Sequence, residues 1–168
     1  MRSLLLLLAA AALSSCAGYR LGNVKPTALT GVRTIAVPML VNDTQHPRAE
    51  VLATSAITDA FAQDGTYRIA DAGRADAVLE ARVKAIRYAA IRSQRLDILR
   101  PEELSSTVAI DWVLKDARDP SKVLASGSST GNSQLFVDSD LQTARNNALP
   151  DAMERVGVAI VSRLANGF

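Results

Sequence analysis

The stretch TVAIDWVLK at residues 107–115 alternates apolar and polar side chains one by one. Successive side chains of a β-strand point to opposite faces of its sheet, so this alternation is typical of a strand with one buried face. The apolar residues of the stretch, which would face the core, are Val108, Ile110, Trp112 and Leu114. Turn-forming residues follow at 116–120. The stretch therefore predicts a half-buried strand that ends in a tight turn.

The segments on either side of this strand have the composition of its neighbours in a sheet. Residues 77–85 alternate in the same way, and beyond Ala85 the apolar positions change parity, which suggests a β-bulge. Residues 123–134 are extended in character but small and polar, as expected of a hairpin partner with a weakly apolar face. Two shorter strands are predicted over 32–37 and 67–70, the first of them ending at Pro38.

Two further segments show the spacing of amphipathic helices. One is predicted over 47–63, with apolar residues at Ala53, Ile57, Ala60 and Phe61. The other follows a capping box at Ser139-Asp140-Leu141-Gln142 and runs toward the chain end. The expected fold is α+β: a two-layer sandwich in which two helices pack on one face of a mixed four- to five-stranded sheet. The opposite sheet face is left open to solvent or to a partner.

The N-terminus has the features of a secretory signal. A single charge at Arg2 precedes the apolar run 4–12, and the run is too short to span a bilayer. The sequence Leu13-Ser14-Ser15-Cys16 follows and resembles the bacterial lipobox, in which the cysteine receives a diacylglyceryl group, becomes residue one and is N-acylated. We expect a signal peptide at 1–15, a lipidated N-terminus and spacer at 16–31, and one domain at 32–168. An ordinary signal peptide that leaves a spare thiol is the alternative.

Composition and motifs exclude several classes of function. With 19 Lys+Arg against 17 Asp+Glu, the chain has no global charge that would attract nucleic acid. His46 is the single histidine and Cys16 the single cysteine, so the sequence has no Cys-His pair, no Ser-His-Asp set and no cluster for a metal. Glu80 and Asp111 each lie beside basic residues, where surface ion pairs are the simpler explanation. We expect neither an enzyme nor a cofactor.

Four short motifs, in order along the chain, resemble one family. They are Cys16-Ala17-Gly18-Tyr19-Arg20-Leu21, then Ile35-Ala36-Val37-Pro38, then Asn42-Asp43-Thr44 with Pro47 and Glu50, and finally Ala75-Asp76-Ala77-Val78-Leu79-Glu80-Ala81. Together they resemble the lipopolysaccharide-assembly lipoprotein LptE and its relatives. The resemblance implies a two-helix, mixed-sheet sandwich tethered to the outer membrane on its periplasmic side. It also implies a place inside the LptD β-barrel, where such proteins help deliver lipopolysaccharide to the cell surface. Ala17, where an Asp favours inner-membrane retention in similar lipoproteins, agrees with an outer-membrane location.

Cations near the predicted hairpin are the candidate contacts for lipopolysaccharide. Arg92, Arg95 and Arg100 fall in the loop that ends at Pro101, and Lys122 lies in what we expect to be a facing turn. Guanidinium groups bind phosphate through two parallel hydrogen bonds, which suits anionic lipid A. The alternative is that these are solvated loop charges.

A second class of lipoprotein shares part of this pattern. The motif Ile35-Ala36-Val37-Pro38 followed by Asn42 and Thr44 also resembles the opening of lipoproteins that form secretion pores or activate cell-wall synthases. Such a protein would be a ring subunit or an activator and would not bind lipopolysaccharide. A long hairpin closed by a C-terminal helix favours the assembly family, and a pore former needs an added apolar hairpin that the sequence lacks. An envelope lipoprotein with another role also stays open.

Overall fold

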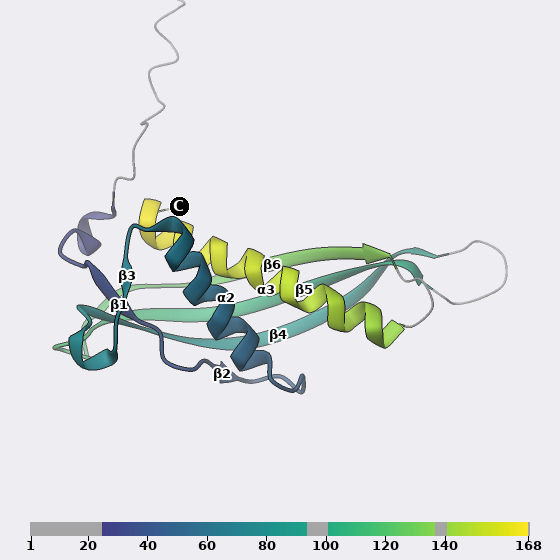
Figure 1. Ribbon diagram of the computed structural model, residues 1–168, viewed down its shortest axis with the longest axis horizontal. Helices are drawn as coiled ribbons and strands as arrows, with labels where there is room; N and C mark the ends of the chain where they lie inside the picture. Colours follow the sequence, from purple (N-terminus) through teal and green to yellow (C-terminus); the bar gives the residue numbers. More distant parts are fainter. Residues whose placement is uncertain (1–24, 94–100, 137–140, 168) are drawn as a thin grey trace, which may run out of the picture.

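The computed structural model describes residues 25–93, 101–136 and 141–167, and these form a two-layer α+β sandwich (Figure 1). The sheet has six strands in the order β3-β1-β4-β5-β6, with β2 paired to β4 beside that path. Pairs among β1 to β4 are parallel, while β4, β5 and β6 form an antiparallel meander, so the sheet is mixed as expected. The elements are η2 (Thr27–Leu29), β1 (Thr34–Ala36), β2 (Val41–Asn42), α2 (Ala49–Asp64), β3 (Arg68–Ile69), η3 (Ala72–Arg74), β4 (Ala77–Ser93), β5 (Pro101–Asp116), β6 (Val123–Phe136) and α3 (Leu141–Asn166).

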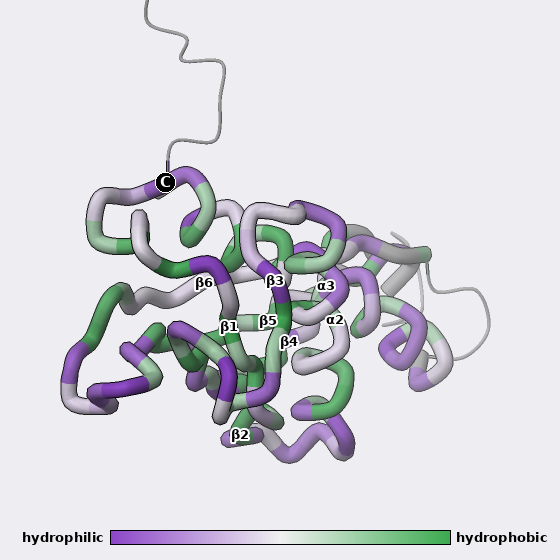
Figure 2. The backbone as a smooth tube through the Cα atoms, turned by 60° about the vertical axis from the view of Figure 1, so that its left-hand side comes forward, coloured by the Kyte–Doolittle hydropathy of each residue, from purple (hydrophilic) through white to green (hydrophobic). Residues whose placement is uncertain are grey.

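Both helices lie across the same sheet face, and α3 extends further than α2 toward the end where β4 leads into β5 (Figure 1). We call this end of the sheet, formed by residues 85–93, 101–109 and 130–136, the distal end. Hydrophobic stretches gather in the middle of the molecule and hydrophilic ones in the peripheral loops (Figure 2). The largest fully buried side chains come from both layers and include Ile35, Leu79, Ile110, Leu114, Ile57, Phe61, Met153, Ile160 and Leu164.

The predicted fold class is confirmed, with differences at the element boundaries. The sixth strand is the two-residue β2, which is too short to leave a periodic signal. Strand β5 begins at Pro101, six residues before the predicted start, because Leu104 and Ser106 continue its buried face. The predicted bulge exists, but it lies between Val83 and Ala85, slightly earlier than the change of parity suggested. Ser139 and Asp140 of the predicted capping box lie outside the described residues.

The N-terminal strand is fastened to the sheet by one carboxylate. Oδ2 of Asp76 accepts hydrogen bonds from the backbone N–H groups of Arg33 and Thr34, each at 3.0 Å, and from Thr34 Oγ1 at 2.9 Å. These donors favour the charged form, and they lower the pKa of Asp76 below its ordinary 3.8. Asp76 belongs to one of the four motifs of the sequence, so part of that motif has a structural explanation.

Replacing Asp76 with alanine is expected to lower the free energy of unfolding by about 1–2 kcal/mol at neutral pH, because three donors lose a charged acceptor. Since the pKa is lower in the folded state, this stabilisation is present above pH 3.8 and disappears as the pH falls through the folded-state pKa. Urea unfolding at pH 7 and at pH 3 measures both effects. Asp71→Ala is the matched control, because the Asp71 side chain pairs with its exposed neighbour Arg74. The prediction would be contradicted if both variants lost the same free energy of unfolding. It would also be contradicted if the loss in Asp76→Ala were the same at pH 7 and pH 3.

Candidate functional site

The structure separates the two candidate cations that it describes, Arg92 and Lys122. Arg92 lies within β4 and not in the loop, because β4 continues to Ser93, and its Cα is paired with that of Glu103 on β5. Arg95 and Arg100 lie outside the described residues, as does Cys16. Lys122 lies in the turn between β5 and β6, at the opposite end of the sheet from Arg92. The predicted facing turn is therefore not opposite Arg92, because the antiparallel β5 carries the chain back along the length of the sheet.

Lys122 also has a partner of its own. Its Nζ lies 3.5 Å from Oδ2 of Asp116, and the lysine side chain is 61% exposed. The backbone N–H of Arg118 donates to the other oxygen of this carboxylate, and the pKa of Asp116 is lowered, chiefly by that hydrogen bond. Lys122 is therefore a solvated charge of the β5–β6 turn. This is the alternative to lipopolysaccharide contact that the sequence left open.

The distal end combines apolar exposure with hydrogen-bonding groups. Phe136, at the end of β6, is 77% exposed, and Ile91, at a bulge in β4, is 47% exposed. Phe136 is paired with Glu103, which is paired with Arg92, so one row of residues crosses all three strands. Sequence analysis did not select Phe136 or Ile91. The signal for Phe136 was present, since an aromatic residue at the end of an otherwise small and polar strand is unusual.

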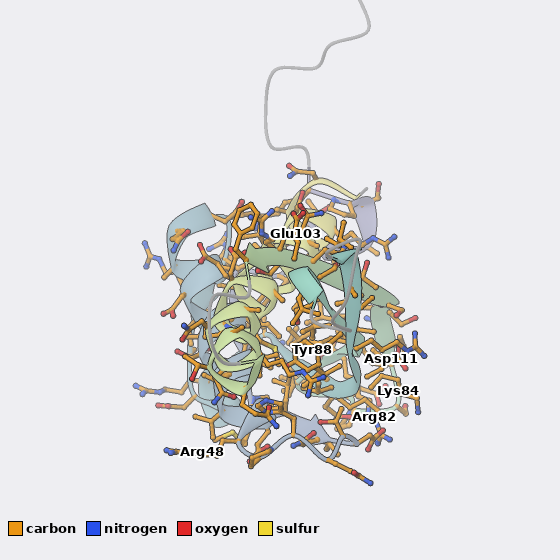
Figure 3. All side chains as sticks on the ribbon, turned by 90° about the vertical axis from the view of Figure 1, so that its right-hand side faces the viewer. Arg48, Arg82, Lys84, Tyr88, Glu103 and Asp111 are labelled. Atoms are coloured by element: carbon orange, nitrogen blue, oxygen red, sulfur yellow. The ribbon has the colours of Figure 1, made fainter. Side chains whose placement is uncertain are left out.

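A polar layer lies beneath the N-terminal half of α3, between apolar rows of the core. Tyr88 of β4 and Ser106 of β5 are paired in register, and Ser106 is fully buried. The guanidinium of Arg145, from α3, lies 5.3 Å from the centre of the Tyr88 ring. The Tyr88 hydroxyl is buried beside Ser106, and burial raises its pKa. Seen from the distal end, Tyr88 lies between α3 and the sheet (Figure 3). Polar groups are therefore buried here among apolar ones, such as Ala148 of α3 and Val108 of β5.

The sheet face that the helices leave open carries paired charges and neutral polar groups. Asp43 lies 3.1 Å from Arg82 and 3.7 Å from Lys84, and these cations project on the side away from α3 (Figure 3). Lys115 and Glu80 form a further pair at 2.6 Å, as predicted for the alternating strands. Toward the distal end the exposed Arg87 is paired in register with Thr107, whose Oγ1 donates a hydrogen bond to Asn132 Oδ1. This face offers hydrogen bonds to a partner without a strong field of either sign.

Metal-binding clusters and membrane-spanning helices are both missing from the part of the chain that the structure describes. No group of three or more possible metal ligands occurs among residues 25–93, 101–136 and 141–167. Within these same ranges, neither helix combines the length and hydrophobicity that crossing a bilayer requires.

Several solved structures share this fold at low sequence identity. PelC from Paraburkholderia phytofirmans, solved as a dodecamer, is 20% identical, with a TM-score of 0.51 over 84% of this chain and 92% of its own. Uncharacterized lipoprotein B from Nitrosomonas europaea is 13% identical, with a TM-score of 0.55 over 88% of this chain and 90% of its own. Protein XCC0632 from Xanthomonas campestris is 18% identical, with a TM-score of 0.52 over 80% of this chain and 85% of its own. At these identities the likeness concerns the fold alone.

The sequence comparisons are more specific. No curated protein matches the chain. The model of the lipopolysaccharide-assembly family LptE matches residues 32–164, which span the sandwich from just before β1 to the last turn of α3. Three of the four motifs from which the resemblance was argued, namely 35–38, 42–50 and 75–81, lie within the matched region. The chain therefore belongs to the LptE lipopolysaccharide-assembly family.

Proposed function

We propose that this protein is an outer-membrane lipoprotein that assists lipopolysaccharide transport to the cell surface as the plug and partner of an LptD-like β-barrel. The observation that carries the proposal is the family match over nearly the whole sandwich. The structure agrees with a non-catalytic role, because a plug needs an open surface for its partner and a stable core, and both are present. The open sheet face, with its paired charges and exposed polar groups, is the surface that we assign to the barrel.

Attachment to the membrane is assigned to Cys16. In this proposal residues 1–15 are removed as a signal peptide, 16–31 form the lipidated N-terminus and spacer, and 32–168 form the LptE-like domain. Each acyl methylene buried in the bilayer contributes about 0.8 kcal/mol, so one chain holds a protein marginally and two or more hold it stably.

Replacing Cys16 with serine is expected to abolish acylation, because serine has no thiol for the diacylglyceryl group, and with it the cleavage before residue 16 that follows this modification. Mass spectrometry of the N-terminus measures both the modification and the cleavage. Thr30→Ser is a suitable control, since it alters a hydroxyl residue of the spacer and leaves Cys16 intact. Finding an unmodified thiol on the native protein would refute the assignment.

Contact with lipopolysaccharide is assigned to Arg92, Arg95 and Arg100, of which Arg92 lies at the distal end in the row that ends at the exposed Phe136. Arginine binds phosphate through two hydrogen bonds, and exposed apolar side chains suit acyl chains. Lys122 is a separate candidate at the other end of the sheet, so the two groups can be tested independently.

The double substitution of Arg92 and Arg95 by alanine is expected to weaken lipopolysaccharide binding at least tenfold, because charge-assisted hydrogen bonds contribute about 1.5–3 kcal/mol each. Lys122→Ala is expected to change affinity less than twofold, since its ammonium group already pairs with Asp116. Binding of purified lipopolysaccharide to the mature protein measures both. Unchanged affinity in the double variant would remove these arginines from the site, and a loss with Lys122→Ala alone would move the site to the opposite end.

Co-purification tests the proposal as a whole. Affinity isolation of the tagged lipoprotein from solubilised outer membranes is expected to yield a large β-barrel protein in equal amount. The rival function, a ring subunit or synthase activator, is favoured by one observation: PelC, which has a similar fold, was solved as a dodecamer. Isolation of a homo-oligomeric ring, or of a cell-wall synthase, in place of a barrel would support the rival and overturn the plug.

A further inference from the structure

The end of the sheet opposite the distal end carries a row of arginines. The backbone N–H of Arg68 donates to the carbonyl of Arg33, and the N–H of Arg33 donates to Oδ2 of Asp76, each at 3.0 Å. The carbonyl of Asp76 in turn accepts from the N–H of Ala117, which Arg118 follows. Three exposed arginines therefore lie on neighbouring segments, where β3, β1 and β4 begin and β5 ends (Figure 1). The proximal end, as we call it, comprises residues 25–34, 64–76, 116–125 and 162–167.

The described chain begins at this same end. The ammonium group of Lys25 lies 4.3 Å from the centre of the Tyr67 ring and donates to the carbonyl of Val32 at 2.9 Å. Tyr67 and Val32 directly precede two of the three arginines in the sequence. Lys25 follows Cys16 by nine residues, a length of chain that spans at most about 32 Å. If Cys16 carries the lipid anchor, as in the proposed function, the proximal end is held within that distance of the bilayer.

The proximal end has an excess of positive charge. Besides the three arginines of the row, its basic residues are Lys25, Arg74, Lys122 and Arg163. Its acidic residues are Asp64, Asp71, Asp76, Asp116 and Asp119. The other described residues have the opposite balance, with one more acidic than basic side chain. The excess of positive charge is therefore a local property of this end.

The carboxylates of the proximal end leave the three arginines without a close partner. Asp116 pairs with Lys122, and Oδ2 of Asp76 accepts the three hydrogen bonds described above. Arg118 acts on Asp76 only from beyond ion-pair distance. Among the residues that the structure describes, no ion pair includes any arginine of the row. A guanidinium group in this situation can bind an external phosphate through two parallel hydrogen bonds.

Exposed aliphatic side chains accompany these charges. Val123, at the start of β6, is 54% exposed, and Ile69, in β3, is 40% exposed. Cations beside exposed apolar side chains favour the boundary between lipid headgroups and acyl chains. The proximal end thus combines the charge and the apolar groups that contact with an anionic bilayer requires.

We infer that the proximal end lies against anionic phospholipid headgroups of the bilayer in which the protein is anchored, with Arg33, Arg68 and Arg118 as its phosphate contacts. The inference rests on the proposed function, because the lipid at Cys16 is what brings a bilayer to this end. Contact here leaves the open sheet face and the distal end uncovered, so the barrel and lipopolysaccharide can still bind to them.

Vesicle flotation tests the inference on the unlipidated mature chain, which consists of residues 16–168 with Cys16 replaced by serine. Without the anchor, binding depends on the protein surface alone. The probes are vesicles of phosphatidylcholine and vesicles that also contain phosphatidylglycerol. We expect at least tenfold tighter binding to the anionic vesicles, because each cation at an anionic surface strengthens binding about fivefold. High salt is expected to abolish the difference, since it screens these charges.

Two variants that remove equal charge identify the surface responsible. The test variant combines Arg33→Gln, Arg68→Gln and Arg118→Gln. The control variant combines Arg82→Gln, Lys84→Gln and Arg87→Gln, which are exposed cations of β4. We expect the test variant to bind anionic vesicles at least tenfold more weakly than the parent and the control variant to stay within twofold of it. Circular dichroism checks that both variants are folded.

Three results would overturn the inference. The first is equal binding of the parent to neutral and anionic vesicles, and the second is equal weakening in the two variants. The third is a preference for vesicles that contain lipopolysaccharide in place of phosphatidylglycerol, lost in the test variant, which would make this end a lipopolysaccharide site. Failure of the proposed function would be seen elsewhere, in the partner that co-purifies and in the mass of the native N-terminus, and vesicle binding measures neither.

Discussion

Gly131→Ala is expected to lower the free energy of unfolding by about 3 kcal/mol, although it adds one methyl group in a β-strand. The new Cβ would lie 2.1 Å from the carbonyl oxygen of Ala152 and 2.5 Å from the backbone nitrogen of Val156. Both neighbours are backbone atoms of α3, so no side-chain rotation relieves the clash. The helix must move away from β6, and a close-packed interior resists such a shift. Chemical denaturation of the unlipidated mature chain measures the loss.

Gly73→Ala provides the matched control, because a Cβ at Gly73 meets no atom within 4 Å. This residue lies in η3, away from both helices. We expect its free energy of unfolding to stay within about 0.5 kcal/mol of the parent. If Gly131→Ala changed the free energy of unfolding as little as the control, α3 would not approach β6 this closely. The placement of the helix over that edge of the sheet would then be wrong.

Phe61→Ala is expected to remove about 3–5 kcal/mol of stability, the range found for truncating a large buried aromatic side chain. Phe61 is fully buried in the last turn of α2 and packs edge-on against Tyr67, with 6.1 Å between ring centres. Tyr67 donates to the carbonyl of Leu164 at 2.7 Å, so the cavity would also loosen the link between α2, β3 and the end of α3. Denaturation with near-ultraviolet circular dichroism follows both the unfolding and the change at Tyr67.

The same substitution at Phe136 is the control for this prediction. Phe136 is 77% exposed at the distal end, so Phe136→Ala is expected to change stability by less than about 0.5 kcal/mol. In the proposed function Phe136 contacts acyl chains, and its replacement should weaken lipopolysaccharide binding without unfolding the domain. A large stability loss at Phe136 would mean that it is buried in the native protein, and a small loss at Phe61 would contradict the described core.

Much of the fold was predictable because burial in this protein follows local periodicity. In β5 every second residue from Leu104 to Leu114 is buried, so the alternation in the sequence maps directly onto the sheet. The helix that became α2 was predicted to within two residues for the same reason, and Gly65, at φ 73°, follows its last residue. The family could also be predicted from short motifs, and at least one of them has a structural role that depends on residue type, since Asp76 accepts a hydrogen bond from Thr34.

The candidate site was less predictable, because its residues are brought together by long-range pairing. Lys122 lies only 22 residues after Arg100, yet the length of β5 places it at the far end of the sheet from Arg92. The polar contact of Tyr88 with Arg145 joins residues 57 positions apart. No local pattern in the sequence records such a contact.

The amino-acid sequence by itself determined the element types, the half-buried character of the sheet and the family, since each depends on neighbouring residues and their spacing. Only the tertiary structure decided which ends and faces meet, as in the hydrogen bonds from Thr34 to Asp76 and the close approach of α3 to Gly131. The physical reason is that periodicity specifies which side of an element is apolar. The angle, register and distance at which two such sides pack are set by the shapes of all the side chains between them.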